Sequence, residues 1–261
     1  MSSVDLQVAG GVASITLNRP DKRNALDRKT IDELSAVLQR CGHDAAARVV
    51  QITGAGKVFC AGADLEEMRA QAAAPPSENI EHAESLARML GILDGLPKPT
   101  IARVNGDGYG GALGLIGACD LVIAVESAKF AFTEVRLGII PAVISPFVVG
   151  KMGEGAALRY FLSADPFGAA ELKAVGLAHE VVAEAQLDQA CSNLIESLLK
   201  GAPGAQAAAK LLIRDVLRSA ESRQQLSVAM AGRLAHLRVQ PEAQEGFAAF
   251  FAKRKPGWRL N

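Results

Sequence analysis

The chain has 261 residues, 49% of them hydrophobic and 21% charged, which allows a well-buried core and argues against disorder. Its 28 basic and 28 acidic residues give a formal net charge of zero, so electrostatics offers no reason to expect nucleic acid or an anionic membrane as a partner. No apolar run reaches the roughly 18 residues that span a bilayer, and the first twelve residues show no secretory signal. We therefore expect a cytoplasmic protein with no membrane partner.

The cysteines form no C-x-x-C pair and lie in apolar stretches, so we expect buried free thiols. They are Cys41, Cys60, Cys119 and Cys191.

The early part of the chain alternates predicted strands and helices. Apolar alternation predicts a strand over 12–17, and further strands are expected over 48–53 and 58–60. Pro97 and Pro99 end the preceding helix and lead into an expected strand over 100–104. Asp27 is expected to begin one helix as its cap, and Ser77 to cap another that ends near Leu96. Between them, residues 71–77, with two prolines, are predicted to form a mobile loop. An apolar helix ending near Cys119 and short strands over 120–125 and 129–132 complete this part.

The late part of the chain is predicted to be almost wholly helical. Helical periodicity runs over 187–200, 206–219, 223–239 and 241–252. The chain is therefore predicted to be an α/β protein that ends in a helical region.

A first candidate for chemistry is Phe59-Cys60-Ala61-Gly62-Ala63-Asp64-Leu65. Small residues between a strand and a helix let a ligand approach the backbone, and free N–H groups at a helix start suit an anionic oxygen. A purely structural strand-to-helix turn explains the same residues, and the motif alone does not decide between the two.

A second candidate is the glycine-rich segment over 104–114, which contains a G-x-G-x-x-G match at Gly106, Gly108 and Gly111. A dinucleotide site would need a following strand that ends in an acidic residue, and Glu126, the nearest acid, does not provide one. We therefore interpret Gly111 as the start of a helix whose N–H faces an enolate oxygen.

A third candidate is Glu134, in the largely apolar run over 132–142. Partial desolvation would raise the pKa of this carboxyl toward values useful for proton transfer. A surface acid paired with Arg136 is the alternative.

Taken together, the three motifs resemble the enoyl-CoA hydratase/isomerase (crotonase) superfamily in order and spacing. The resemblance extends from Leu17-Asn18-Arg19-Pro20 and Arg23-Asn24-Ala25-Leu26 to Glu245-Gly246-Phe247 and the segment over 251–256. It implies the crotonase fold, a spiral of repeated ββα units over 1–200 that carries the acyl-CoA site. A helical region over 201–261 would then serve oligomerisation and cover the site.

The resemblance implies a catalytic role for four positions. Ala63 and Gly111 would donate backbone N–H groups to the thioester oxygen, and loss of one such donor typically costs about 3–4 kcal/mol of barrier. Glu134 matches the second of two hydratase glutamates, whereas the first falls on Gly114, which has no side chain.

The glycine at position 114 leaves the reaction open. The surrounding residues look like bacterial methylglutaconyl-CoA or isohexenylglutaconyl-CoA hydratases, with the Ala142 N–H helping to position water and Arg69 or Arg136 as partners for a second carboxylate. A single base at Glu134 also resembles Δ3,Δ2-enoyl-CoA isomerases. A homologue that binds acyl-CoA or a partner without turnover is the third alternative.

The resemblance further implies a set of CoA and acyl contacts, no metal, and no cofactor beyond the coenzyme A of the substrate. It also implies a homotrimer or a dimer of trimers. The contact residues are Arg23, Ala25, Ala61, Asp64, Leu65, Met68, Ala142, Phe247 and Lys253.

The sequence lacks the residue patterns of metal-dependent and serine hydrolases. The four histidines have no metal-ligand spacing, and no G-x-S-x-G is present. Cys60 lies near the proposed oxyanion site, but with no histidine nearby it is interpreted as a packing residue.

Overall fold

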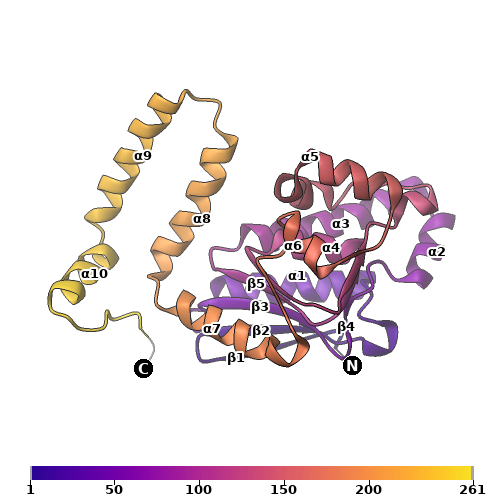
Figure 1. The fold of residues 1–261 in the computed structure, drawn as a ribbon, viewed down its shortest axis with the longest axis horizontal. Helices are drawn as coiled ribbons and strands as arrows, with labels where there is room; N and C mark the ends of the chain where they lie inside the picture. The colour runs from indigo at the N-terminus through magenta and orange to yellow at the C-terminus, as the bar shows by residue number, and fades with distance from the viewer. Residues whose placement is uncertain (1, 260–261) are drawn as a thin grey trace. The chain divides into compact units, whose positions relative to one another are not determined.

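The computed structural model describes residues 2–259 and divides the chain into two compact units, Met1–Ile195 and Glu196–Asn261 (Figure 1). The division falls inside helix α7 (Leu187–Leu199). The first unit contains two β-sheets and their covering helices, and the second is helical.

The larger sheet of the first unit has six strands in the order β1-β2-β3-β5-β7-β10. All neighbours are parallel except β1 and β2, which form an antiparallel hairpin. The predicted strand over 12–17 is confirmed, and its alternate residues Ala13, Ile15 and Leu17 are buried as period-2 alternation requires. The bounds are β1 Val4–Ala9, β2 Val12–Leu17, β3 Val49–Gly54, β5 Thr100–Val104, β7 Leu121–Val125 and β10 Glu180–Val182.

The smaller sheet has four short strands in the order β4-β6-β8-β9. The strands β4, β6 and β8 pair in parallel, and β9 joins β8 antiparallel. The strand β6 lies inside the glycine-rich segment, where the sequence analysis placed none. The bounds are β4 Val58–Cys60, β6 Asp107–Tyr109, β8 Lys129–Ala131 and β9 Phe167–Gly168.

The helices of the first unit include α3, α4 and α5, which lie together on one side of the larger sheet (Figure 1). The predicted cap of α1 is confirmed, because the Asp27 carboxylate accepts from the Thr30 N–H at 2.7 Å. The predicted cap of α3 is wrong: that helix starts at Pro76, since proline is well suited to a first helical position, and Ser77 lies inside it. The helices are α1 Arg28–His43, α2 Leu65–Ala73, α3 Pro76–Gly95, α4 Gly111–Ala118, α5 Ser145–Ser163 and α6 Ala169–Ala174.

The predicted loop over 71–77 is mostly helical. Residues 71–73 are the last turn of α2, and residues 76–77 begin α3. The loop prediction rested on the two prolines. Proline is also favoured at the first position of a helix, so its presence does not require a long loop.

Helix α4 packs tightly because its glycines face other core residues. A Cβ atom added at Gly114 would lie 2.5 Å from Ile144 Cγ2 and 3.0 Å from Leu90 Cδ1. At Gly117 the nearest atom would be Val148 Cγ1, at 2.7 Å. These contacts leave no space for a side chain on this face of α4.

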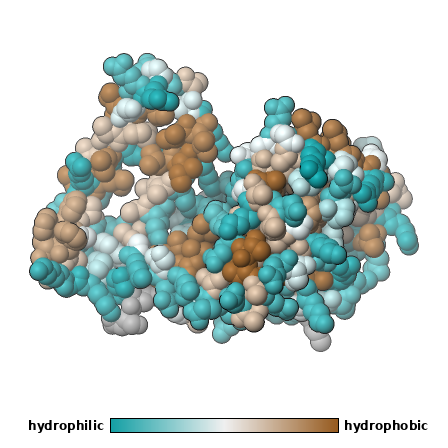
Figure 2. All heavy atoms as spheres, in the orientation of Figure 1, coloured by the Kyte–Doolittle hydropathy of each residue, from teal (hydrophilic) through white to brown (hydrophobic). Residues whose placement is uncertain are grey.

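The second unit consists of α8 (Pro203–Arg218), α9 (Arg223–Arg238), α10 (Pro241–Phe251) and the end of α7. Glu242 of α10 accepts from the backbone N–H of Gly204, and Arg233 of α9 pairs with Asp215 of α8 at 2.7 Å. Apolar side chains lie on the surfaces of α8 and α9 (Figure 2). Among the described residues, no helix combines the length and apolarity needed to cross a membrane.

The packing of α4 predicts that Gly114→Ala is destabilising. The added methyl group overpacks the contact with Ile144, so the free energy of unfolding should fall by about 1–3 kcal/mol in urea denaturation. Gly150→Ala in α5 is the matched control, because a Cβ there has no neighbour within 4 Å and should raise stability by up to about 1 kcal/mol. Equal effects of the two substitutions would contradict this packing.

Candidate active site

The three sequence motifs meet because each follows one strand of the smaller sheet. Ala63 comes shortly after β4, Gly111 after β6 and Glu134 after β8. The three strands are parallel neighbours, so their carboxyl ends lie at the same edge of the sheet. All three residues line one cavity.

The backbone at Ala63 leaves its N–H free to meet a ligand. Ala63 forms a parallel bridge with Leu26. In this bridge Leu26 makes its hydrogen bonds to the residues before and after Ala63, and not to Ala63 itself. The Leu26 N–H donates to the Gly62 carbonyl at 2.7 Å, and the Asp64 N–H donates to the Leu26 carbonyl at 3.1 Å. The N–H of Ala63 itself therefore points away from Leu26.

The loop that carries Leu26 is held in place by Asn24. This buried residue has a positive φ of 57° and donates from Nδ2 to the carbonyls of Ala55 (2.9 Å) and Val58 (2.7 Å). Its Oδ1 accepts from the Arg19 N–H at 3.0 Å. The loop is thereby fixed against the start of β4.

The second N–H belongs to Gly111, the first residue of α4, which has no intrahelical acceptor at that position. Gly62 and Gly111 approach closely: a Cβ on Gly62 would lie 3.5 Å from the Gly111 nitrogen and 2.5 Å from the Tyr109 carbonyl oxygen. Gly62 also has a φ of 86°, so only glycine fits there without strain. This contact brings the Ala63 and Gly111 backbones together.

Glu134 lies directly over the start of α4. Its Oε1 would be 3.2 Å from a Cβ on Gly110, whose own N–H donates to the Ala131 carbonyl at 3.0 Å. Glu134 Oε2 is buried and has no hydrogen-bond partner among the described residues. Burial raises the pKa of Glu134. The carboxyl is therefore poised to exchange a proton beside the Gly111 N–H.

The cavity that joins these groups, here named the apolar cavity, has a volume of about 540 Å³. Among the described residues, Glu134 is the one acid in its lining, and no lysine or arginine lines it. Its lining is Leu26, Ile31, Ala63, Met68, Gln71, Ala72, Asn79, His82, Ala83, Leu86, Gly111, Glu134, Leu137, Ile139, Ile140, Pro141, Ala142, Val143 and Ile144.

The position of the first hydratase glutamate is filled by hydrocarbon. Ile144, itself a lining residue, occupies the space beside Gly114, and Leu90 closes the other side. A second carboxylate cannot be placed there without moving α5.

Ala142 lines the apolar cavity, but its N–H is already used. It donates to the Ile140 carbonyl at 2.8 Å, so it is not free to hold a water molecule in this conformation.

The predicted CoA contacts lie beside the Ala63 motif. Arg23 is exposed and lies 3.7 Å from Asp107, and the Ala61 N–H donates to the Arg23 carbonyl at 3.0 Å. Ala25 is buried, and Leu65 is 78% exposed. The backbone of this segment is thus well ordered, with Leu65 presented at its surface.

Asp64 is a structural cap. Its carboxylate accepts from the Glu66 and Glu67 N–H groups at the start of α2 and pairs with Arg19 at 2.9 Å. Burial raises the pKa of Asp64, but the Arg19 and backbone hydrogen bonds outweigh it and hold the pKa below its usual value. Its side chain is therefore committed to holding α2.

The remaining predicted contacts are divided between the two units. Met68 lines the apolar cavity in the first unit. Phe247, which is 46% exposed, and Lys253, with a φ of 50°, belong to the second unit.

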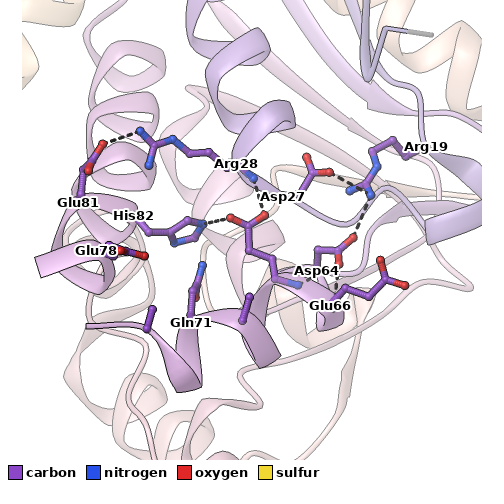
Figure 3. A pocket seen from close by; sticks show the side chains of 12 residues that line it. Arg19, Asp27, Arg28, Asp64, Glu66, Gln71, Glu78, Glu81 and His82 are labelled. Carbon is purple, nitrogen blue, oxygen red and sulfur yellow. Dashed lines mark hydrogen bonds and ion pairs between the residues drawn. The ribbon is translucent and has the colours of Figure 1, made fainter. Parts of the chain in front are cut away.

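A second cavity of about 730 Å³, here named the acidic cavity, is lined by six carboxylates and two guanidiniums (Figure 3). Glu67 is fixed in it by the Arg28 N–H, which donates to Oε2 at 2.7 Å. Gln71 and His82 line both cavities and so form part of the wall between them. The lining is Arg19, Asp27, Arg28, Asp64, Glu66, Glu67, Ala70, Gln71, Ala74, Glu78, Glu81 and His82.

The sequence analysis did not identify Gln71 or His82. Helical spacing could have found Gln71, because Met68, Gln71 and Ala72 are spaced i, i+3 and i+4 along one face of α2. The expected loop over 71–77 concealed this periodicity.

Cys60 is a packing residue, as predicted. It is fully buried, and burial raises the pKa of its thiol to about 12. Its Sγ accepts from the Gly62 N–H at 3.4 Å, so it supports the turn next to the site. All four cysteines are free and buried, which confirms that expectation.

Comparison with known proteins places the chain among acyl-CoA enzymes. A family model described as enoyl-CoA hydratase/isomerase matches residues 7–261. The crystal structure of an enoyl-CoA hydratase from Shewanella pealeana superposes with a TM-score of 0.94 at 41% identity, covering 98% of this chain and 96% of the other.

Two curated relatives carry more specific names. A hydroxycinnamoyl-CoA hydratase-lyase of Pseudomonas fluorescens is 35% identical over 80% of this chain and 76% of its own length. A carnitinyl-CoA dehydratase of Proteus mirabilis is 34% identical over 98% of both. The predicted α/β crotonase fold with a helical C-terminal region is confirmed. The chain belongs to the enoyl-CoA hydratase/isomerase family of the crotonase superfamily of enzymes.

Proposed function

We propose that this enzyme adds water reversibly across the α,β double bond of an enoyl-CoA thioester, with Glu134 as its single acid–base group. The observation that carries the proposal is the buried, unpartnered carboxyl oxygen of Glu134, which lines the same cavity as the Ala63 and Gly111 backbones. Three groups of this kind are what a conjugate addition to a thioester needs.

The two N–H groups hold the negative charge that the reaction creates. When a nucleophile adds to Cβ, electrons move from the double bond to the thioester oxygen and form an enolate. The N–H groups of Ala63 and Gly111 would donate to that oxygen. Such preorganised donors are worth about 3–4 kcal/mol each in similar sites.

Glu134 moves the protons. Its carboxylate takes a proton from water as the oxygen bonds to Cβ, and the resulting carboxylic acid then gives a proton to Cα. The enolate collapses, and the product contains one more water than the substrate. Both transfers use one carboxyl, which agrees with the hydrocarbon packing at Gly114.

The same single carboxyl favours a second candidate, a Δ3,Δ2-enoyl-CoA isomerase. There Glu134 would remove a proton from Cα of a 3-enoyl thioester and return it to Cγ through a dienolate, whose oxygen the same two N–H groups would hold. The isomerase needs no water, whereas the hydratase needs one bound beside Glu134. Product mass separates the two, since only hydration adds 18 Da, the mass of one water molecule. A homologue that only binds acyl-CoA would give neither product.

A branched glutaconyl-CoA, such as 3-methylglutaconyl-CoA, is the finer substrate suggested by the sequence resemblance. It carries a second carboxylate that a cation would stabilise. Arg69 and Arg136 are both exposed, neither lines the apolar cavity, and Arg136 lies 3.8 Å from Asp165. The assay should therefore compare 3-methylglutaconyl-CoA with a neutral enoyl-CoA such as crotonyl-CoA.

Two further expectations remain proposals. Coenzyme A enters as part of the substrate, and the chemistry above uses no separate cofactor. The cytoplasmic location stays a prediction of the sequence.

Glu134→Gln should reduce turnover of crotonyl-CoA or 3-methylglutaconyl-CoA by at least about 100-fold, because the amide cannot exchange protons. Loss of thioester-conjugated absorbance, with product mass, measures this. Glu84→Gln is the matched control, since Glu84 is exposed on α3, lies outside the apolar cavity and pairs with Arg88 at 3.4 Å. Full activity of the Glu134 variant with these substrates would exclude Glu134 as the acid–base group of the hydration, and the same result with a 3-enoyl-CoA would exclude the isomerase mechanism.

The acidic limb of the pH profile should report Glu134. Hydration needs the carboxylate, so kcat/KM should fall as the pH drops through a pKa that burial has raised above the ordinary 4.5. Because the pKa of Glu134 is higher in the folded protein than in the unfolded chain, protonation of this carboxyl favours the folded state. Its titration therefore does not itself unfold the protein. A limb centred at or below 4.5, with the fold intact by circular dichroism, would contradict the assignment.

We also propose a homotrimer or a dimer of trimers. The second unit exposes Leu217 (80%), Phe250 (78%) and Phe251 (78%), which an interface would cover. Sedimentation equilibrium should give the mass of three or six 27.3 kDa chains, and a monomer mass would refute the proposal.

A further inference from the structure

The proposed reaction leaves the length and charge of the acyl chain open, and the lining of the apolar cavity bears on both. Helix α2 contributes Met68 and Ala72, and helix α3 contributes Ala83 and Leu86. The segment over 137–144 supplies a further wall, mostly of branched aliphatic side chains. The space between α2 and α3 therefore depends on which side chains these two helices bring together.

Helices α2 and α3 run antiparallel, as two contacts between them show. Asn79 Nδ2 in α3 donates to the Gln71 carbonyl in α2 at 3.0 Å. One turn later in α3, His82 Nε2 lies 3.2 Å from Glu67 Oε1, which is one turn earlier in α2. Moving forward along α3 therefore means moving back along α2, toward its start beside Ala63.

This arrangement sets Ala83 opposite Met68. Ala83 directly follows His82, and Met68 directly follows Glu67. Both Ala83 and Met68 line the apolar cavity. The side chain of Ala83 is a single methyl group, so the α3 wall carries little bulk at this level. A larger side chain at position 83 would occupy part of the cavity.

The cavity is longer than a four-carbon acyl group. The Asp64 carbonyl accepts from the Met68 N–H, so Asp64 stands in the first turn of α2, directly after Ala63. From Asp64 to Ala72 the helix rises about 12 Å, so the Ala63 and Ala72 backbones are at least about 8 Å apart. Both residues line the cavity. An extended chain advances about 1.25 Å per bond, so a crotonyl group spans only about 4 Å and a chain of about six to eight carbons still lies within the lining.

The charges of the lining disfavour an anionic end group. Among the described residues, no lysine or arginine lines the apolar cavity, and Glu134 is its one acid. The wall at Gln71 and His82 is shared with the acidic cavity, which has six carboxylates against two guanidiniums. A second carboxylate on the acyl chain would lose its hydration with no cation to offset the loss, and it would approach charges of its own sign. A hydrocarbon chain carries neither cost.

We propose that the apolar cavity selects uncharged acyl chains longer than four carbons, and that Ala83 is the specificity-determining residue that admits them past Met68. The inference rests on the proposed function in one respect, that the apolar cavity holds the acyl chain. It also favours crotonyl-CoA over 3-methylglutaconyl-CoA as a substrate.

The test compares crotonyl-CoA, 2-octenoyl-CoA and 2-octenedioyl-CoA. In the wild type, kcat/KM should be at least about tenfold higher for octenoyl-CoA than for crotonyl-CoA, because the additional carbons are buried in an apolar lining. The dicarboxylate has the same chain length as octenoyl-CoA, and its kcat/KM should be at least about tenfold lower, because the buried charge has no partner.

Ala83→Leu should remove the preference for the longer chain. The leucine fills the space opposite Met68, so the ratio of kcat/KM for octenoyl-CoA to that for crotonyl-CoA should fall about tenfold, while crotonyl-CoA keeps close to its wild-type value. Ala83→Val is a smaller change that should give an intermediate ratio, and it provides the result if the leucine variant does not fold. Ala87→Leu is the matched control, because Ala87 is exposed on α3 and lies outside the apolar cavity. It should keep the wild-type ratio.

Three kinetic results would overturn the proposal. They are no preference for octenoyl-CoA over crotonyl-CoA in the wild type, a preference for the dicarboxylate, and Ala83 variants that keep the wild-type ratio or lose activity equally with both chain lengths.

Binding separates failure of this proposal from failure of the proposed function. If no thioester is turned over, calorimetry with butanoyl-CoA, octanoyl-CoA and octanedioyl-CoA still compares the three chains. Tightest binding of octanoyl-CoA by the wild type, lost in Ala83→Leu and kept in Ala87→Leu, would support the selection in an enzyme of another reaction. Equal binding of butanoyl-CoA and octanoyl-CoA, or tightest binding of octanedioyl-CoA, would refute it.

Discussion

Parallel pairing of β4, β6 and β8 determines where the chemistry can occur. Each strand is only three residues long, yet the segment after each carries one functional group: the Ala63 N–H, the Gly111 N–H and the Glu134 carboxyl. The Gly62 backbone packs against Tyr109 and Gly111, and the Gly110 N–H bonds to the end of β8. A shift of any one strand would therefore separate the two proposed oxyanion donors or move the proposed base away from them.

The same packing explains why one carboxyl must suffice. Helix α4 starts at an oxyanion donor, so its position is fixed by the site, and its face at Gly114 is pressed against Ile144 and Leu90. A glutamate there would have to displace core hydrocarbon. The chain thus combines a tightly packed helix with one buried carboxyl in the cavity, and the proposed hydration would need water to be held by means other than a second carboxylate.

The two cavities on either side of Gln71 and His82 differ in chemistry. The apolar cavity has Glu134 as its acid, whereas the acidic cavity has a surplus of carboxylates that are partly balanced by Arg19 and Arg28. Because α2 and α3 supply side chains to both, the lining of the apolar cavity and the ion pairs of the acidic cavity depend on the same two helices.

Local sequence determined much of this protein. Apolar alternation predicted β2, the prolines before Thr100 predicted β5, helical periodicity predicted the late helices, and the three motifs identified the residues that meet in the cavity. The β1 strand, the start of α3 at Pro76 and the helical state of Gln71 were not predicted, because they depend on pairing or on helix starts that short-range patterns describe poorly. Only the tertiary structure decided that Ile144 fills the space at Gly114, that the Ala142 N–H is occupied, and that Gln71 and His82 line both cavities. The packing at Gly114 and the shared wall of the two cavities bring together residues far apart in the chain, which short-range patterns do not describe. The Ala142 N–H bonds locally, to Ile140, and depends on a turn conformation that the sequence analysis did not predict.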